Sequence, residues 1–356
     1  MTILQDIPLA PFTTFGVGGA ARWFAEAASE DEVAEAVAWA REHAVPLFVL
    51  GGGSNLLVSD AGFDGLVLRI ALRGITRVED GDGHRLWHRI YRAAAGEPWE
   101  HCVQQTLDGD CAGLECLSGI PGTVGGTPVQ NVGAYGQEVS STIDRVRAFD
   151  LHDRAFVEFT AAECGFAYRR SRFNSTDRDR FIVTRVDYRL TPGGAPTLRY
   201  ADVQRELEAA GIGSPTLVQV AAAVRRIRRS KGMLIVAGDP DSGSAGSFFK
   251  NPVIGQERFR EIAAQFEKEP PHFPAGLGAD DSNSVKIPAA WMIEQAGFRK
   301  GYALGEAAIS SLHTLALVNR GRATAQEILA LAAQISAAVE ARFGLQLERE
   351  PVLVGF

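Results

Sequence analysis

Cysteine and histidine are both scarce in this 356-residue chain. The four cysteines form neither a CxxC pair nor a dense framework, so reduced thiols in a cytoplasm are the simplest interpretation. The seven histidines include no HExxH motif and no Cys/His cluster, so no catalytic metal is expected. The cysteines are Cys102, Cys111, Cys116 and Cys164.

The chain also lacks long apolar runs and long basic runs. No apolar stretch reaches the length that spans a bilayer, and residues 1–10 show no basic segment followed by an apolar core, so neither a membrane nor a secretory signal is expected. The net charge is −7, whereas a protein that binds the backbone of a nucleic acid normally presents a basic face. Nucleic acid is therefore not an expected partner. The one basic stretch, residues 225–231, is interpreted mainly as the solvated face of a helix.

What remains is the composition of a globular protein, 46% hydrophobic and 22% charged, and the length favours two or three domains. Strand and helix patterns alternate at the start: Ser29 and Glu32 predict a capping box, and short apolar strands are predicted at 47–50 and 65–70. Residues 232–246 are rich in Gly, Asp and Ser, so we expect a linker there. The predicted domains are 1–70, 71–231 and 232–356.

Periodicity and capping residues predict further elements along the chain. These are a turn at Asp80–Gly83, half-buried strands near 143–150 and 181–190, a helix from Ser214–Pro215 to about Lys231, a helix from Pro288 to Gly297, a helix capped by Thr324 and Glu327 that runs to about Phe343, and a terminal strand from Leu345 to Val354. No internal repeat or low-complexity tract is present.

The first of two glycine-rich stretches is Gly-Gly-Gly-Ser-Asn at residues 51–55, directly after the strand at 47–50. Three successive glycines let backbone N–H groups approach one anion, and Ser54 and Asn55 add donors, which fits a pyrophosphate. A tight turn with no ligand is the alternative for this motif alone. The absence of Gly-Lys-Ser/Thr and of GxGxxG argues against a nucleotide triphosphatase and a Rossmann site.

The second glycine-rich stretch, residues 119–136, contains too many glycines for a regular helix or strand. Glycine loses more conformational entropy on folding than other residues, so two such loops favour a large flat ligand such as a dinucleotide. Gln130, Asn131 and Tyr135 would then contact a ring edge or a ribose. A loop-rich packing motif is the alternative.

A third motif, residues 246–252, places polar groups beside two aromatic rings. Ser247, Lys250 and Asn251 supply a hydroxyl, an ammonium and an amide, while Phe248 and Phe249 can exclude water from a ligand. The alternative is a turn serine that precedes two core phenylalanines.

Two charged residues complete the set of candidates. Arg169 follows Tyr168 in a locally aromatic stretch, where its guanidinium can hold a carboxylate or stabilise an enolate. Glu350 precedes Pro351 in the predicted terminal strand. A surface arginine and an edge-strand carboxylate are the respective alternatives, and periodicity alone leaves them open.

Together, the motifs of this chain resemble in content and order those of the UDP-N-acetylenolpyruvoylglucosamine reductase family. The resemblance runs from about Leu9 to the last residue. The motifs are Phe12–Gly19, Leu50–Val58, Ser118–Gly126, Gln130–Gly136, Tyr168–Phe173, Ala245–Pro252 and Leu347–Glu350. The chain departs from the family pattern at Thr13, Ala94, Ala95 and Ser244, and its link at 232–243 is longer than usual.

The resemblance implies an α+β fold: a two-subdomain FAD-binding fold of the vanillyl-alcohol-oxidase type, followed by a C-terminal α+β substrate domain. It also implies a cytoplasmic flavoenzyme of peptidoglycan precursor synthesis. Non-covalent FAD is reduced by NADPH and then reduces UDP-N-acetylglucosamine enolpyruvate to UDP-N-acetylmuramate. A related FAD-dependent oxidase and a non-catalytic nucleotide-sugar-binding module are the alternative functions.

The resemblance also implies roles for individual residues. Ser247 is expected to protonate C2 of the substrate, while Arg169 and Glu350 polarise the enolpyruvyl carboxylate and stabilise the enolate. Tyr200 matches a loop tyrosine of the longer type of the family, which covers the UDP-sugar. The other expected substrate contacts are Lys231, Lys250, Asn251 and Gln295. The expected FAD contacts are Gly51, Gly52, Gly53, Ser54, Asn55, Ser118, Gly119, Ile120, Gly122, Thr123, Gly125, Gly126, Gln130, Asn131, Gly133, Ala134 and Tyr135.

Overall fold

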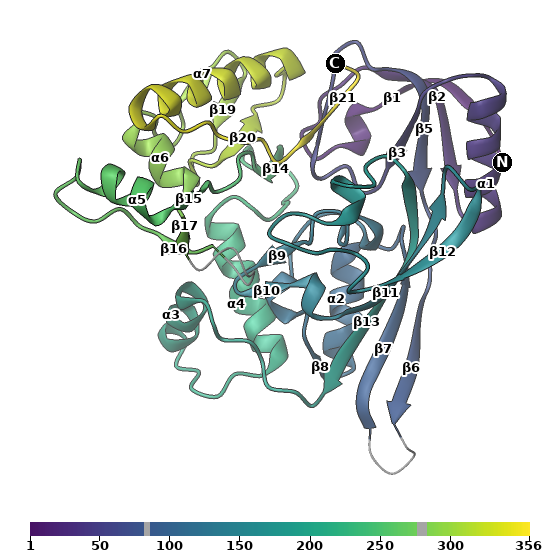
Figure 1. The fold of residues 1–356 in the computed structure, drawn as a ribbon, viewed down its shortest axis with the longest axis horizontal. Helices are drawn as coiled ribbons and strands as arrows, with labels where there is room; N and C mark the ends of the chain where they lie inside the picture. The colour runs from purple at the N-terminus through teal and green to yellow at the C-terminus, as the bar shows by residue number, and fades with distance from the viewer. Residues whose placement is uncertain (82–85, 276–282) are drawn as a thin grey trace. The chain divides into compact units, whose positions relative to one another are not determined.

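The computed structural model describes residues 1–81, 86–275 and 283–356. The turn predicted at Asp80–Gly83 falls partly outside these ranges. Helices and mostly antiparallel sheets are both present, which confirms the expected α+β class (Figure 1). None of the helices in these ranges combines the length and apolar character that crossing a membrane requires.

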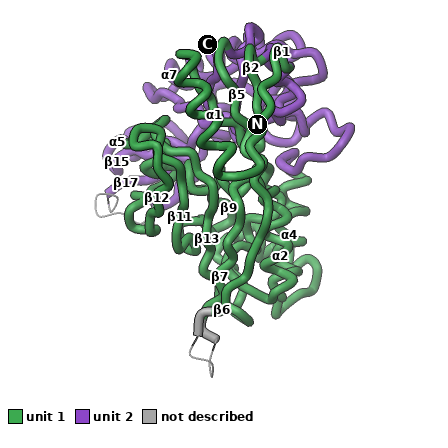
Figure 2. The backbone as a smooth tube through the Cα atoms, turned by 90° about the vertical axis from the view of Figure 1, so that its right-hand side faces the viewer, with its two compact units in different colours: residues 1–7, 21–52, 64–230 green, residues 8–20, 53–63, 231–356 purple. Residues whose placement is uncertain are grey.

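The chain forms two compact units, each assembled from separate stretches (Figure 2). Unit 1 contains residues 1–7, 21–52 and 64–230, and unit 2 contains residues 8–20, 53–63 and 231–356. The three domains predicted from the sequence stay a prediction.

A four-stranded sheet begins unit 1. Its order is β1 (Leu4–Pro8), β2 (Ala20–Ala27), β5 (Phe63–Ile70) and β3 (Leu47–Leu50), and β3 runs parallel to β5. Helix α1 (Glu30–Glu42) starts as predicted, since the Ser29 hydroxyl accepts a hydrogen bond from the Glu32 N–H. The Glu32 carboxylate accepts from Ala28 instead of Ser29, so the return bond of the capping box is displaced by one residue.

A larger antiparallel sheet forms the rest of unit 1 (Figure 1). Its path is β12 (Ala155–Thr160), β11 (Ile143–Asp150), β13 (Phe181–Pro192), β7 (Leu86–Ala94) and β6 (Ile75–Gly81), with β8 (Cys111–Ala112) paired to β13. Helix α2 (Trp99–Asp108) shares its core, because Trp99 is almost fully buried and its ring lies 5.7 Å from that of Tyr188. The strands predicted at 143–150 and 181–190 are confirmed.

Two helices end unit 1, α3 (Ala201–Ala209) and α4 (Leu217–Ser230). They enclose a small apolar cluster that includes Cys116, Val203 and Val224. Helix α4 begins three residues after the predicted Ser214. Thr216 and Gln219 supply the cap, since each side chain accepts the backbone N–H of the other residue.

The described residues of unit 2 form two small antiparallel sheets and three α-helices, besides the parallel pair of β4 (Leu56–Val58) and β21 (Val352–Val354). The first sheet has the order β14 (Ser244–Ser247), β20 (Ala316–Asn319), β19 (Ala307–Ile309) and β18 (Ala303–Leu304). The second has the order β15 (Val253–Gly255), β17 (Ser284–Lys286) and β16 (Phe273–Pro274). The helices are α5 (Gln256–Ala263), α6 (Ala289–Gln295) and α7 (Ala325–Phe343).

The start of α7 confirms the predicted capping box of Thr324 and Glu327. The carboxylate of Asp60 also accepts the N–H groups of Ala325 and Gln326, at 2.8 and 3.0 Å. The helix ends at Gly344, whose φ of 65° is the left-handed value that glycine adopts without strain.

The terminal strand is shorter than predicted. Only β21 (Val352–Val354) is a regular strand, and it pairs in parallel with β4 (Leu56–Val58). The prediction of a strand from Leu345 is therefore wrong for its first seven residues. Part of this stretch bonds a different segment, around Phe248, and Pro351 has no N–H to continue a ladder.

Candidate cofactor and active site

The first glycine loop leaves β3 at Leu50 and makes a very close backbone approach at Gly53. Gly53 has φ +63°, and a Cβ there would lie 1.8 Å from the carbonyl oxygen of Phe12. Glycine is therefore required at this position. The N–H of Thr14 donates to the Gly53 carbonyl at 3.1 Å, and the buried Thr14 hydroxyl has no hydrogen-bond partner among the described residues.

Unit 1 brings parts of the two glycine loops together. A Cβ on Gly52 would lie 2.5 Å from the Cα of Gly122, and a Cβ on Gly51 would lie 3.0 Å from the Thr123 hydroxyl. Gly126 differs from these, because a Cβ there would meet no atom within 4 Å and its φ is not positive. Neither packing nor backbone strain within the protein explains that glycine.

Within unit 2, the first glycine loop lies beside two catalytic candidates. The Asn55 side-chain amide donates to the carbonyl of Glu350 at 3.2 Å, and the Asn55 carbonyl accepts from Val352 at 3.0 Å. The Glu350 N–H in turn donates to the carbonyl of Phe248 at 3.0 Å, which places Glu350 opposite the segment that begins with Ser247. Asn55, Ser247 and Glu350 therefore belong to one neighbourhood.

The segment after Ser247 is anchored in the apolar core of unit 2. Phe248 and Phe249 are each 1% exposed, and the Phe248 ring lies edge-on to Phe15 at 6.2 Å. Ser247 itself pairs with Ala316 at the end of β14 and is only half-buried. The two phenylalanines are core residues, while the serine next to them stays accessible.

The polar residues that follow have partners within unit 2. Lys250 forms an ion pair with Glu348, and the Asn251 side-chain oxygen accepts the N–H of Ala289 at 2.9 Å, which caps the start of α6. Gln295 is exposed at the other end of α6. The helix begins at Ala289, one residue after the predicted Pro288.

His313 is a residue of this region that the sequence did not single out. Burial lowers the pKa of its ring to about 4, and the charges of Lys231 and Lys300 act in the same direction. Its Nδ1 accepts the N–H of Leu315 at 3.0 Å, so the neutral ring carries its proton on Nε2. The Leu315 carbonyl accepts the N–H of Phe248 at 2.8 Å, which connects this turn to the Ser247 segment.

In unit 1, Arg169 packs against the second glycine loop. Its guanidinium donates to the Gly133 carbonyl at 2.9 Å, and its backbone has the left-handed φ of 54°. Asn174 donates to the Arg169 carbonyl at 3.1 Å, and the Ser171 hydroxyl donates to Val129 at 2.6 Å. The Tyr-Arg-x-Ser-x-Phe motif thus fastens the arginine to the glycine loop.

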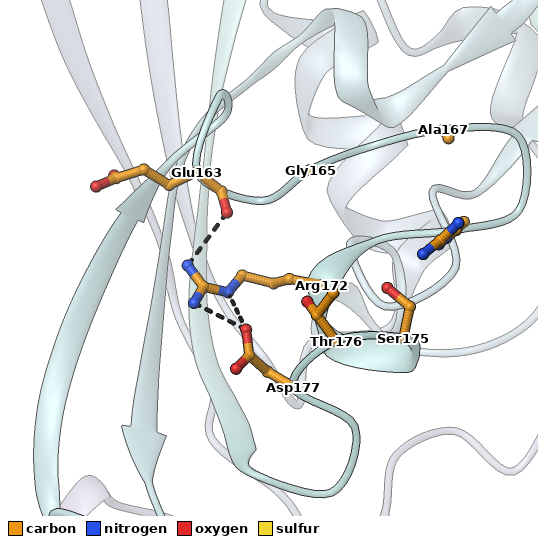
Figure 3. A pocket seen from close by; sticks show the side chains of 8 residues that line it. Glu163, Gly165, Ala167, Arg172, Ser175, Thr176 and Asp177 are labelled. Carbon is orange, nitrogen blue, oxygen red and sulfur yellow. Dashed lines mark hydrogen bonds and ion pairs between the residues drawn. The ribbon is translucent and has the colours of Figure 1, made fainter. Parts of the chain in front are cut away.

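A pocket of about 360 Å³ lies along the same segment (Figure 3). Arg172 crosses it and bonds the carboxylate of Asp177 at 2.8 Å and the carbonyl of Glu163 at 3.1 Å. This pocket contains none of the residues predicted to bind cofactor or substrate. The pocket is lined by Glu163, Gly165, Ala167, Arg170, Arg172, Ser175, Thr176 and Asp177.

Three predicted cofactor residues are engaged by protein groups. The buried Asn131 amide donates to Glu138 and to the Ala167 carbonyl, both at 3.0 Å, and it accepts from the N–H of Ser140. The Ser118 hydroxyl and the Gly119 N–H both donate to the carboxylate of Glu100. These groups hold the loop in shape.

The basic stretch is mostly a solvated helix face, as expected, and Arg228 is its exception. Arg225 and Arg226 are exposed and pair with carboxylates, whereas Arg228 is only 8% exposed and donates to the Gly119 carbonyl at 3.0 Å. Burial lowers the pKa of its guanidinium from the ordinary value. In the sequence, Arg228 stands two residues before the end of α4, and that place does not distinguish a buried arginine from an exposed one.

Tyr135 and Tyr200, predicted for cofactor and substrate respectively, touch each other. Their ring centroids are 5.5 Å apart at 89°, an edge-to-face contact. Burial raises the pKa of Tyr135 to about 12. Tyr200 is the residue before the first turn of α3, so its loop ends where that helix begins.

Two family models match the chain. One is described as UDP-N-acetylenolpyruvoylglucosamine reductase, C-terminal domain, and matches residues 239–354, while the other is described as FAD binding domain and matches residues 21–155.

Similar proteins cover nearly the whole chain. A UDP-N-acetylenolpyruvoylglucosamine reductase of Streptomyces coelicolor is 45% identical and spans 99% of this chain and 90% of its own length. One of Pseudomonas syringae pv. syringae is 43% identical over 99% of both chains. The crystal structure of UDP-N-acetylenolpyruvylglucosamine reductase from Thermus caldophilus is 27% identical, with a TM-score of 0.65 over 99% of this chain and 98% of that one.

Proposed function

The chain belongs to the UDP-N-acetylenolpyruvoylglucosamine reductase family, and from that premise we propose how its own residues carry out the family's reaction. It is an oxidoreductase of peptidoglycan precursor synthesis with the two-subdomain FAD-binding fold and a C-terminal α+β domain. It uses FAD and NADPH to reduce UDP-N-acetylglucosamine enolpyruvate to UDP-N-acetylmuramate. The observation that carries the residue assignments is the neighbourhood of Asn55, Ser247 and Glu350.

The glycine loops fit a bound FAD. Thr14 offers a buried hydroxyl without a partner beside Gly53, and Gly126 leaves open the space that a side chain would fill. Backbone N–H groups of glycine loops suit a pyrophosphate, because no side chain keeps them from the anion. The other cofactor residues proposed from the sequence are therefore retained, with Thr14 added and with Ser118, Gly119 and Asn131 assigned to loop shape.

Ser247, Arg169 and Glu350 are proposed to act on the enolpyruvyl group. Bound FAD supplies the redox chemistry, hydride transfer from NADPH to C3. Negative charge then develops toward the substrate carboxylate, and the Arg169 guanidinium stabilises it. The half-buried Ser247 hydroxyl delivers the proton to C2, held in place by the core phenylalanines that follow it. Glu350 acts in its protonated form and donates a hydrogen bond to the enolpyruvyl carboxylate, because an ionised Glu350 would repel that carboxylate.

The substrate contacts remain those proposed from the sequence: Tyr200, Lys231, Lys250, Asn251 and Gln295. Since Asn251 caps α6 and Lys250 pairs with Glu348, each of these two would have to share its side chain between protein and ligand. Tyr200 is proposed to cover the nucleotide sugar. Tyr200→Phe should then raise the KM for the sugar nucleotide while NADPH still reduces the flavin at the parent rate. An unchanged KM would refute this role.

The compartment and the partners follow from the reaction. NADPH and nucleotide sugars are metabolites of the cytoplasm, and the four cysteines are free thiols, which suits a reducing compartment. We therefore propose a cytoplasmic enzyme with small-molecule substrates. The net charge of −7 gives no reason to propose a nucleic-acid partner.

One assay tests the proposed function. Purified protein should be yellow, and its NADPH oxidation should depend on the enolpyruvyl sugar nucleotide. NADPH oxidation that depends instead on oxygen would favour a related oxidase, and colourless protein that binds the nucleotide sugar would favour a binding module. Acid precipitation should release the colour into the supernatant, since a covalent flavin would stay in the pellet.

A further inference from the structure

A buried carboxylate lies at the centre of a polar network in unit 1. Glu115 is 0% exposed and belongs to the short helical turn η2 (Glu115–Leu117). One of its oxygens accepts from the Gln137 side chain and from the N–H of Thr197, both at 2.7 Å, and the other accepts from Gly113 at 2.8 Å. Burial of a carboxylate is costly unless hydrogen bonds compensate it, and here three N–H donors do so.

Gln137, the residue directly after the second glycine loop, completes the network. It lies in β10 (Gln137–Glu138), which pairs with β9 (Gly133–Ala134), and it is 6% exposed. Its side-chain oxygen accepts from the N–H of Cys116 at 2.8 Å. Its amide also donates to the Thr197 hydroxyl at 3.0 Å.

Thr197 is held through all of its polar groups. Its N–H bonds Glu115, its hydroxyl bonds Gln137, and its carbonyl accepts from the Cys116 thiol at 3.4 Å. It lies in the middle of residues 194–200, which contain no helix or strand. A segment that has no backbone hydrogen bonds of a helix or sheet takes its position from such side-chain contacts. Thr197 is only three residues from Tyr200, so fixing Thr197 also restricts where Tyr200 can lie.

Tyr200 provides a second link to the same region, because its ring makes an edge-to-face contact with Tyr135 of the second glycine loop. Residues 194–200, which we call the tyrosine loop, are thus tied to residues 133–138 at Thr197 and again at Tyr200. Apolar packing alone would allow the loop to shift along its axis, whereas a directional polar network admits one register.

We infer that Glu115 and Gln137 are positioning residues for substrate binding: they fix Thr197, so that Tyr200 is held in place before the nucleotide sugar arrives. The inference rests on the proposed role of Tyr200. It predicts that the network determines substrate affinity and not flavin reduction. If only a fraction of molecules holds the loop in place, the apparent affinity falls in proportion to that fraction.

Thr197→Val tests the network with the least disturbance, because valine keeps the shape and the N–H and removes only the hydroxyl acceptor. The KM for the enolpyruvyl sugar nucleotide should rise about threefold to tenfold, the usual effect of one lost hydrogen bond, while kcat and the NADPH half-reaction stay within about twofold. Thr197→Ser restores the acceptor and should return the KM to the parent value. Gln137→Leu should have a larger effect in the same direction.

Hydrogen exchange gives a readout that does not depend on activity. The amides of residues 195 and 197–200 should exchange about tenfold faster in Thr197→Val, while amides of β11 keep the parent rate. The inference would be overturned if Thr197→Val exchanged faster in the loop but kept the parent KM. It would also be overturned if loop exchange were unchanged in both Thr197→Val and Gln137→Leu. A parent protein with no substrate-dependent NADPH oxidation would refute the proposed function itself, which separates the two failures.

Discussion

The Ser247–Glu350 region of unit 2 and the tyrosine loop of unit 1 are held by different kinds of bonds. In the first, backbone groups meet backbone groups: Glu350 bonds Phe248, and Lys250 bonds Glu348. In the second, side chains fix the backbone, since Glu115 and Gln137 hold Thr197. Backbone pairing tolerates most side chains, so it does not itself dictate the side chains at positions 247 and 350. The tyrosine loop instead depends on the identity of residues far from it in the sequence.

The largest expected effect comes from Ser247→Ala, which removes a reacting group without touching the backbone pairing. Reduction of the flavin by NADPH needs no proton from this side chain and should survive. Reoxidation by the enolpyruvyl substrate should slow by about 10²–10⁴-fold, the usual cost of a lost general acid. Stopped-flow absorbance of the flavin, with each substrate in turn, measures the two half-reactions separately.

Ser244→Ala is the matched control, because Ser244 lies on the same strand and its hydroxyl only accepts the N–H of Gly246. It should lower stability or slow both half-reactions alike. If Ser247→Ala is reoxidised as fast as the parent, or if both variants behave alike, Ser247 is a structural serine.

A smaller effect is expected from acidification, which should lower the stability of the protein through the Ser247 region, where His313 lies. The folded-state pKa of His313 is lowered to about 4, below its ordinary value of 6.5. Between these two values the unfolded chain binds more protons than the folded one, so the stability conferred by the neutral ring is lost as the pH falls from 6.5 through 4. The loss should reach at most about 3 kcal/mol.

Urea unfolding at pH 7 and pH 5 measures this loss, and His313→Gln should flatten the difference. Protection factors, which correct for the pH dependence of intrinsic exchange, should fall at amides 313–317 on acidification, while those of residues 195 and 197–200 in the tyrosine loop stay constant. Equal acid sensitivity in both regions would show that His313 is not its source.

The smallest effect is expected from Asn55→Ala. The variant loses the side-chain bond to the Glu350 carbonyl but keeps the backbone bond between Asn55 and Val352. In the protein stripped of FAD, where the proposed cofactor contact of Asn55 plays no part, the free energy of unfolding should fall by about 1 kcal/mol. The amides of residues 349, 350 and 352 should then exchange less than tenfold faster. A greater loosening here than Thr197→Val causes in the tyrosine loop would reverse the contrast between the two regions.

Local patterns were sufficient for much of the fold. The sequence correctly predicted three elements: the Thr324–Glu327 capping box, the strand at 47–50 and the strand at 143–150. Each depends only on residues a few positions apart in the chain. The family and its cofactor were also accessible from motif order. The length of the terminal strand was overestimated, because alternating apolar residues do not show which segment will be available as a pairing partner.

The sequence by itself therefore determined the elements, the glycine loops and the family to which the chain belongs. Only the folded protein shows that Arg228 is buried while Arg226 and Arg229 are exposed, that the His313 ring stays neutral, and that Glu115 holds a loop 82 residues away. Whether a side chain is buried, and which group it bonds, depends on residues that are distant in the chain. The local sequence around that side chain does not reveal these contacts, because only the fold brings the residues together.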